Sequence, residues 1–360
     1  MKLGAIVVIG LEDEPSRSTA SQQTPIPLAQ PLACLDVLGH STAERIIERF
    51  VRADMDVVSV LSQEESCGVK PALMESKNVE VQAVGDLIGA IYQRLKDYSR
   101  NGIEHAFVVS ANAYVETDLL DLFYFHRESR QGATQAIDRE GPLNLWVVDC
   151  LKAQPTDDQN LLAQTGRPSY FIREYVNRLN HPRDLRQFAV DLLRSRCAAR
   201  PPGREIKRGV WIDDGAEVHR RARVVAPAYI GRASKVMQDT LITRCSNVEK
   251  ECCVDYGTVV ENSSILQNTH VGICLDVCHA VVNGNTLLSL GRNVVVEIAD
   301  PSILRKNSES SISVPAKDRK QVKNRILFSR RKVKQQAVAV LQPAAGSVPE
   351  PSRPESNIQG

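Results

Sequence analysis

The sequence lacks the cysteine spacing of a closed metal site. It contains nine cysteines, an odd number, and no Cys-x-x-Cys pair. Cysteines without such a framework are typical of structural thiols in a reducing compartment. Cys274 and Cys278, with His270 and His279 nearby, match no closed zinc pattern. The sequence therefore favours structural thiols over a metal site.

Long hydrophobic runs and a strong charge imbalance are also missing. The apolar stretch over residues 2–10 is too short to span a membrane, and no secretory cleavage site follows it. The net charge is +2, with 42% hydrophobic and 24% charged residues, as in globular proteins. We therefore expect a cytoplasmic protein with no transmembrane segment. Its 360 residues predict about two domains and a tail.

An aliphatic residue recurs at every sixth position in the second half of the chain. The series consists of Ile212, Val218, Val224, Ile230, Val236, Ile242, Val248, Val254, Val260 and Leu266. A second series of small residues lies four positions later: Ala216, Ala222, Ala228, Ser234, Thr240, Ser246, Cys252, Thr258 and Ser264. This period predicts a parallel β-helix, in which three hexads make a coil of about 18 residues and stacked coils bury both series.

The aliphatic series changes register after Leu266. The next members, Val271 and Val277, come one residue early, and His270 falls in a position that small residues occupy before it. A bulge or a looser corner would account for the change. We expect the β-helix to cover residues 210–300 and to end at Pro301.

Predicted strands and helices alternate in the first half of the chain. Strands are expected at 3–9, 56–61, 79–81, 106–110, 133–137 and 145–149, and helices at 43–53, 84–97 and 117–127. This alternation predicts a doubly wound, mostly parallel α/β sheet over residues 1–150. Ligands bind beyond the carboxyl ends of strands in such sheets, here the loops after Ile9, Ser110 and Asp149. Residues 151–209 are expected to form a connector with helices at 171–179 and 182–196.

Two local sequences resemble the sugar-1-phosphate nucleotidyltransferases, also called nucleotide-sugar pyrophosphorylases. Residues 31–39, Pro-Leu-Ala-Cys-Leu-Asp-Val-Leu-Gly, are similar to the stretch after that family's Pro-Lys-Pro signature. Residues 107–112, Phe-Val-Val-Ser-Ala-Asn, resemble the strand that ends in its Gly-Asp, and residues 117–127 the helix after it. The resemblance covers roughly residues 1–150. It implies a nucleotide-diphospho-sugar transferase-like domain followed by a left-handed β-helix of hexapeptide repeats.

The chain departs from this family where phosphate is handled. The resemblance implies a glycine-rich loop with an Arg after the first strand, a signature Lys and a Mg²⁺-binding Asp. Here Gly10 is followed by three carboxylates within four residues, Gln30 replaces the Lys, and Asn112 replaces the Asp. Three carboxylates repel a triphosphate, and a neutral amide is a weak Mg²⁺ ligand. Arg17 and Asp149 are the candidates for substitute charges.

The resemblance and its departures together predict a catalytically impaired pyrophosphorylase-like protein. Gly10, Arg17 and Asn112 are the candidate nucleotide-binding residues, and no catalytic residue, metal site or cofactor is assigned. The expected role is binding or regulation in sugar-nucleotide and polysaccharide precursor metabolism, with a sugar nucleotide or sugar phosphate as ligand. The expected assembly is a homo-oligomer, or a hetero-oligomer with an active relative.

Two other functions stay open at this point. The first is an active, Mg²⁺-dependent sugar-1-phosphate nucleotidyltransferase that uses rearranged residues. The second is a coenzyme A-dependent hexapeptide acyltransferase, in which His219, His270 or His279 would act as the base.

The end of the chain, residues 301–360, is expected to be a tail. Residues 305–334 contain eleven Lys or Arg and two acidic residues, with a single aromatic residue, Phe328. A solvated tail is the default for such a segment, and a short helix on an anionic surface is the alternative. Residues 344–360 are rich in Pro and Ser and are expected to be disordered.

Overall fold

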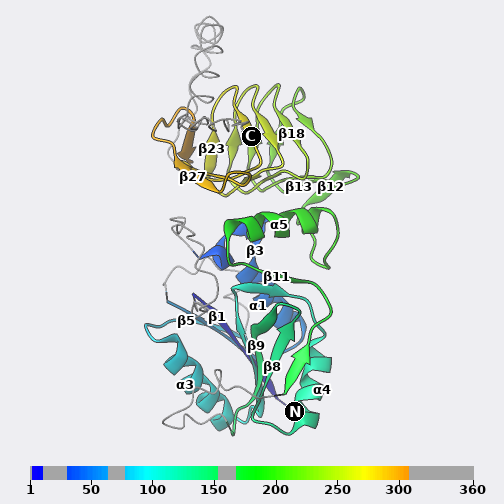
Figure 1. Cartoon of the computed structure of the whole chain (residues 1–360), viewed down its shortest axis with the longest axis vertical. Helices are drawn as coiled ribbons and strands as arrows, with labels where there is room; N and C mark the ends of the chain where they lie inside the picture. The colour runs from blue at the N-terminus through cyan, green and yellow to red at the C-terminus, as the bar shows by residue number, and fades with distance from the viewer. Residues whose placement is uncertain (1, 11–30, 64–77, 153–167, 308–360) are drawn as a thin grey trace, which may run out of the picture. The chain divides into compact units, whose positions relative to one another are not determined.

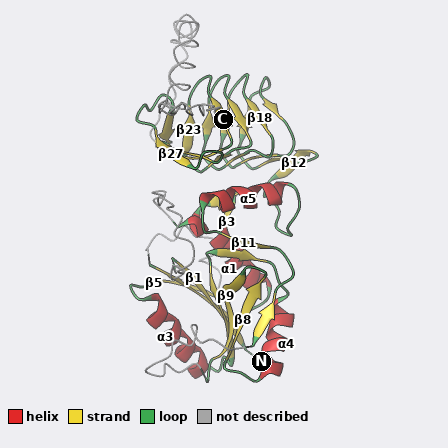
Figure 2. Cartoon of the chain, viewed as in Figure 1, coloured by secondary structure: helices red, strands yellow, loops and turns green. Residues whose placement is uncertain are grey.

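The computed structural model describes residues 2–10, 31–63, 78–152 and 168–307 (Figures 1 and 2). Arg17, Gln30 and the carboxylates after Gly10 lie outside these ranges, as do residues 308–360 with almost all of the basic segment. The expectations for these residues stay predictions.

A seven-stranded mixed sheet forms the core of the N-terminal half, with the order β10-β8-β9-β6-β1-β4-β5. Its strands are β1 (Leu3–Ile9), β4 (Val57–Ser62), β5 (Val79–Ala83), β6 (His105–Ser110), β8 (Ala133–Asp138), β9 (Gly141–Asp149) and β10 (Ser169–Phe171). Strands β1, β4, β5 and β6 are parallel, whereas β9 runs antiparallel to both of its neighbours. The predicted α/β class with a largely parallel sheet is confirmed.

Helices cover both faces of this sheet (Figure 2). Helix α1 (Thr42–Arg52) and helix α4 (Leu119–Ser129) pack on one face, and α3 (Leu87–Arg100) packs on the other. Helix α1 begins with a capping box, in which the Ser41 side chain accepts from the backbone of Glu44 and the Glu44 side chain accepts from that of Ser41. The predicted inward residues of α1, Ile46, Ile47 and Phe50, are buried.

The connector between the two halves differs from its prediction. Helix α5 (Pro182–Leu193) forms as expected, but residues 171–179 are not helical. They contain the end of β10, which extends the sheet beyond residue 150, and β11 (Val176–Arg178), which pairs with β7 (Ala113–Val115). The predicted helix over residues 171–179 was wrong because a short apolar segment can form either a helix or a strand. Which of the two forms depends on whether another strand is there to pair with it. A 3-10 turn, η1 (Leu32–Cys34), and the hairpin strands β2 (Asp36–Val37) and β3 (His40–Ser41) precede α1.

Short strands in the C-terminal half rotate among three parallel sheets, which we call the coil stack (residues 210–283; Figure 1). Each strand pairs with the strand three places further on: Val210 pairs with Ala228, and Val236 with Val254. An edge strand, β12 (Arg204–Lys207), pairs antiparallel with β13. The others are β13 (Val210–Ile212), β14 (Glu217–Val218), β15 (Arg223–Val224), β16 (Ala228–Ile230), β17 (Lys235–Val236), β18 (Leu241–Thr243), β19 (Asn247–Val248), β20 (Cys253–Val254), β21 (Val259–Glu261), β22 (Ser264–Ile265), β23 (Thr269–Val271), β24 (Asp276–Cys278) and β25 (Ala280–Asn283).

Most of the predicted aliphatic series forms one buried column inside the coil stack. Its members from Ile230 to Val260 are at most 1% exposed, whereas Ile212, Val218 and Val224 of the first coil are only partly buried. The second coil covers these three side chains from one side only. The coil stack therefore has an open end at its first coil.

The hydrogen bonds explain why the residues of the second series are small and often carry a hydroxyl group. The Ser234 hydroxyl donates to the Glu249 carbonyl at 2.5 Å and accepts from Cys252 N at 3.0 Å. Ser263, which takes the small position predicted for Ser264, repeats this arrangement at another corner: it accepts from Ala280 N and donates to the Val277 carbonyl. Each hydroxyl thus satisfies buried backbone groups of the following coil.

The change of register lies one corner earlier than predicted. Val260 is followed in the column by Ile265, five residues on, while Leu266 packs outside it against α5. From this corner on, strands pair 17 residues apart, as Cys253 does with His270, so Thr269 takes the small position instead of His270. The sequence alone did not show which of the two residues enters the column, because Ile265 and Leu266 are adjacent and both aliphatic.

The parallel coils end at Asn283 and do not continue to Asp300. Strands β26 (Thr286–Ser289) and β27 (Val294–Glu297) pair antiparallel with β25 and with each other, and β28 (Leu304–Lys306) pairs antiparallel with β23. Leu304 is 2% exposed and packs against the column. Pro301 therefore does not end the fold, because the antiparallel strands after Asn283 cover the last coil.

No helix within the described ranges is long and apolar enough to cross a membrane.

Substitutions in the column are expected to lower stability more in the middle of the coil stack than in its first coil. Val254→Ala removes two methyl groups from a fully buried site and is expected to lower the free energy of unfolding by about 2 kcal/mol. Val218→Ala makes the same change at the open end and is expected to cost less than about half as much. Urea unfolding of both variants measures the difference, and equal costs would contradict an open first coil.

Candidate functional site

The order of the strands identifies the crevice where a ligand is expected. The chain moves from β1 through β4 to β5 on one side, and then returns to the other side of β1 with β6. Ligands of open α/β sheets bind outside the carboxyl ends of the strands at such a switch point. The switch-point crevice therefore lies beyond Ile9 and Ser110, as two of the three predicted loops require.

The described residues at the ends of β1 and β6 carry no charge themselves. Charged Arg178 lies nearby, since it pairs with Ala113, and it forms an ion pair with Asp138. Val8 pairs with Ser110, and Ala111 N donates to the Val8 carbonyl at 2.8 Å, so Gly10 and the residues after Ser110 leave the sheet side by side. Gly10 has φ +90°, and a Cβ there would lie 3.4 Å from Gln63 Oε1. The Ser110 hydroxyl is buried and has no hydrogen-bond partner within the described part of the chain. These groups offer hydrogen bonds but no charge.

Asn112 lies at this edge of the sheet, as predicted. Its carbonyl accepts from Leu179 N at 2.8 Å, which ties the β6–β7 turn to the segment before α5. An amide side chain supplies no charge to offset that of Mg²⁺. Among the described residues, no group of three or more His, Cys, Asp or Glu side chains could hold a metal ion. The described residues therefore do not fit the Mg²⁺ site that the family resemblance implies.

Asp149 is at the opposite edge of the sheet. Strand β9 runs antiparallel to β6, and Asp149 pairs with His105 at the beginning of that strand. The Asp149 carboxylate lies 3.1 Å from Lys152 Nζ. The prediction that Asp149 supplies a carboxylate beside Asn112 is wrong, because the sequence shows that a strand is present but not its direction.

The three candidate histidines for acyl transfer have separate local partners. His270 in β23 has Nε2 3.7 Å from Asp255 Oδ2, and His279, after β24, has Nδ1 2.7 Å from Asn262 Nδ2. His219 Nδ1 accepts from Arg221 N at 3.2 Å. Each contact is between neighbouring coils or within one turn, so none by itself defines a shared site.

The sequence analysis missed a buried carboxylate that joins the coil stack to the sheet. Glu249 is fully buried, and its Oε1 accepts from Leu38 N at 2.8 Å while its Oε2 accepts from Gly39 N at 2.9 Å. Leu38 and Gly39 have φ +49° and +76°. A Cβ on Gly39 would lie 2.5 Å from atoms of both Pro202 and Tyr229, so only glycine fits the turn.

An amide connects Glu249 to a buried cation. Asn247 Nδ2 donates to Glu249 Oε1 at 2.6 Å, and Asn247 Oδ1 accepts from Arg186 Nη1 of α5 at 3.3 Å. Arg186 is 4% exposed, and burial lowers its pKa to about 10. Beside this relay, Asp36 Oδ2 lies 3.1 Å from Lys250 Nζ. The only signal in the sequence was an acidic residue directly after the inward Val248.

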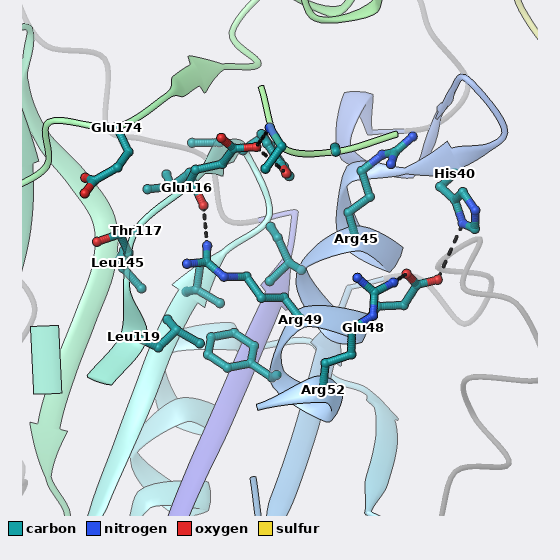
Figure 3. Close-up of a pocket in the computed structure, with 18 of the residues that line it drawn as sticks. His40, Arg45, Glu48, Arg49, Arg52, Glu116, Thr117, Leu119, Leu145 and Glu174 are labelled. Atoms are coloured by element: carbon teal, nitrogen blue, oxygen red, sulfur yellow. Dashed lines mark hydrogen bonds and ion pairs between the residues drawn. The ribbon is translucent and has the colours of Figure 1, made fainter. Parts of the chain in front are cut away.

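A cavity of about 560 Å³ lies on the α1 face of the sheet (Figure 3). Arginines of α1 line it, and residues 198–200 contribute to one wall. Val109 and Leu145, which belong to the core on this face, form part of its floor. The cavity lies on the α1 face, and residues 113–117 of its lining follow directly on Asn112.

The Glu249 junction predicts a pH dependence of stability. Burial raises the pKa of Glu249 to about 7, with a further contribution from Asp36, although three N–H donors oppose the change. The folded state therefore binds an extra proton between about pH 4.5 and 7, and stability falls as the pH rises through this window. Glu249→Gln removes the ionisation, so its stability relative to wild type should rise by roughly 2 to 3 kcal/mol from pH 5 to pH 8.

Urea unfolding at the two pH values measures this change. The exposed Glu251→Gln is the matched control and is expected to show a much smaller change. A difference between wild type and Glu249→Gln that stays constant with pH would contradict the prediction.

With this geometry established, the chain was compared with known proteins. No protein-family model matches it, and none of the curated proteins does.

Proposed function

We propose that the chain is a nucleotide-sugar pyrophosphorylase-like protein that binds a sugar nucleotide in the switch-point crevice and has lost normal transfer. The observation that carries this proposal is that the described residues at the ends of β1 and β6 carry no charge. Gly10 and Ser110 flank the crevice at the strand ends, and an amide, Asn112, stands where the resemblance implies a metal-binding carboxylate.

The repeat length of the coil stack supports the same family. Strands of the coil stack recur so that partners lie 18 residues apart in the first coils, as in Val210 and Ala228. We infer a left-handed β-helix of hexapeptide repeats, following a nucleotide-diphospho-sugar transferase-like sheet. The antiparallel β9 and the returning β6 fit a doubly wound sheet with one reversed strand.

The chemistry explains why binding and transfer separate. Attack of a sugar phosphate on a nucleoside triphosphate develops negative charge, which basic side chains and Mg²⁺ must stabilise. A sugar nucleotide carries less charge, and its hydroxyls and base are bound by neutral donors and acceptors. The Ser110 hydroxyl, Gln63 and Asn112 supply such groups, and Arg17 remains the predicted contact for the diphosphate.

We propose a regulatory role in the supply of polysaccharide precursors. In a homo-oligomer, or in a complex with an active relative, binding of the ligand to this chain would affect the partner subunit. The open first coil supports association, because it leaves Ile212, Val218 and Val224 partly exposed. The protein is expected to act in the cytoplasm.

Calorimetric titration with a panel of nucleotide sugars and nucleoside triphosphates, with and without Mg²⁺, tests the proposal. We expect at least one sugar nucleotide to bind, with an affinity that Mg²⁺ changes by less than about threefold, and no release of pyrophosphate. Mg²⁺-dependent pyrophosphate release would establish the active enzyme instead. Acetyl transfer from acetyl coenzyme A that His270→Ala or His279→Ala abolishes would establish the acyltransferase.

Asn112→Asp provides the sharper test of the crevice. Restoring a carboxylate at this position is expected to make sugar-nucleotide affinity depend on Mg²⁺, by about tenfold or more, because a charged oxygen binds Mg²⁺ far better than an amide. The backbone contact to Leu179 does not depend on the side chain.

Asn101→Asp, at the exposed end of α3, makes the same chemical change away from the crevice. It is expected to leave the Mg²⁺ dependence unchanged. An Asn112→Asp variant that behaves like this control would place the ligand elsewhere.

A further inference from the structure

The cavity on the α1 face has an apolar floor and a basic rim. Its floor consists of buried core side chains: Ile46, Phe50, Val109, Leu119 and Leu145. Its rim carries the arginines Arg45, Arg49, Arg52 and Arg200. A volume of about 560 Å³ is within the range of small-molecule sites.

Three of these arginines, Arg45, Arg49 and Arg200, form no ion pair with a carboxylate of the described residues, and Arg200 is exposed. Arg45 donates to the carbonyls of Val37 and Leu38 at 2.8 and 3.2 Å, and Arg52 is paired with Glu48 at 2.6 Å. Arg49 donates only to the Val115 carbonyl, and no carboxylate of the described residues lies within ion-pair distance of it. Figure 3 shows its side chain extending from α1 toward Thr117, above Leu119.

Removing this guanidinium from water has a cost that the Val115 carbonyl and the surrounding described residues offset only in part. Burial lowers the pKa of Arg49, and the carboxylates of Glu116, Asp118 and Glu174 raise it only from a distance. A partly buried cation without an ion pair is stabilised when an anion reaches it. Arg49 therefore favours an anionic group inside the cavity.

The acidic residues of the rim limit the charge of that anion. Glu116 is engaged, since its Oε1 accepts from the Tyr114 hydroxyl at 3.0 Å and from Ala198 N at 2.6 Å. Glu174 is exposed and lies on the side of the cavity opposite Arg45 (Figure 3). These two carboxylates would repel a polyanion such as a triphosphate. A single carboxylate or phosphate head fits Arg49, which donates to one carbonyl, whereas Arg45 already donates to the carbonyls of Val37 and Leu38.

We propose that this cavity binds an organic anion with one carboxylate or phosphate head and a short apolar body. The head pairs with the free N–H groups of Arg49, and the body packs on Ile46, Leu119 and Leu145. This ligand goes beyond the proposed function, because it is a small anion held by Arg49 of α1 and not a sugar nucleotide held at the ends of β1 and β6.

Calorimetry on the full chain with octanoate, octyl phosphate and neutral octanamide tests the head and the body separately. Octanoate or octyl phosphate is expected to bind about tenfold or more tightly than octanamide, since a charge-assisted hydrogen bond distinguishes them. The tighter of the two anions identifies the head. Octanamide binding equally well, or neither anion binding, would overturn the proposal.

Substitutions at Arg49 test the cation itself. Arg49→Gln is expected to lower the affinity for the preferred anion about tenfold or more, and Arg49→Lys to retain part of it, because only the charge is kept. Arg100→Gln is the matched control, because Arg100 is an exposed arginine of α3 that pairs with Asp97 and does not line the cavity; it should change the affinity less than about threefold. Unchanged affinity in Arg49→Gln would overturn the proposal.

A further variant fills the cavity, and its thermal unfolding shows whether a loss of binding is due to a loss of stability. Leu119→Trp occupies the floor without touching a charge, and it is expected to abolish anion binding while thermal unfolding stays cooperative. Full binding by this variant would also overturn the proposal. Sugar-nucleotide titrations of Leu119→Trp distinguish the two sites, since the switch-point crevice should be unaffected, and failure at one site leaves the other intact.

Discussion

The fully buried carboxylate of Glu249 is the interaction that joins the coil stack to the α/β sheet. Its two oxygens hold the successive N–H groups of Leu38 and Gly39, in the turn that leads into α1. A buried charge is costly, but here three N–H donors surround it, and Asn247 links it to the buried Arg186. The turn, and with it the beginning of α1, therefore depends on a residue of the second half of the chain.

The coil stack supplies a rigid support for this carboxylate. The aliphatic column fills its interior, and the small hydroxyl side chains satisfy backbone groups of the following coil, so little freedom remains at Val248 and Glu249. The two ends of the stack differ. Antiparallel strands with Leu304 cover the last coil, whereas the first coil is open.

The sheet has two candidate ligand sites. Gly10, Ser110 and Asn112, at the ends of β1 and β6, carry no charge. The cavity on the α1 face contains Arg49 without an ion pair and suits a small anion. Because α1 follows directly on the turn held by Glu249, the junction positions the cavity wall, while β1 and β6 position the crevice.

The sequence by itself determined the features that depend on near neighbours. The period of six from Ile212 to Val260, the strand over residues 3–9 and the cap of α1 at Ser41 are encoded within a few residues of each other. Tertiary structure decided the rest. It chose Ile265 over Leu266 for the column, set β9 antiparallel, and brought Glu249 to Leu38, 211 residues away. Local periodicity is fixed by the chain's own geometry, but such long-range partners are chosen only when packing offsets the entropy of closing a long loop.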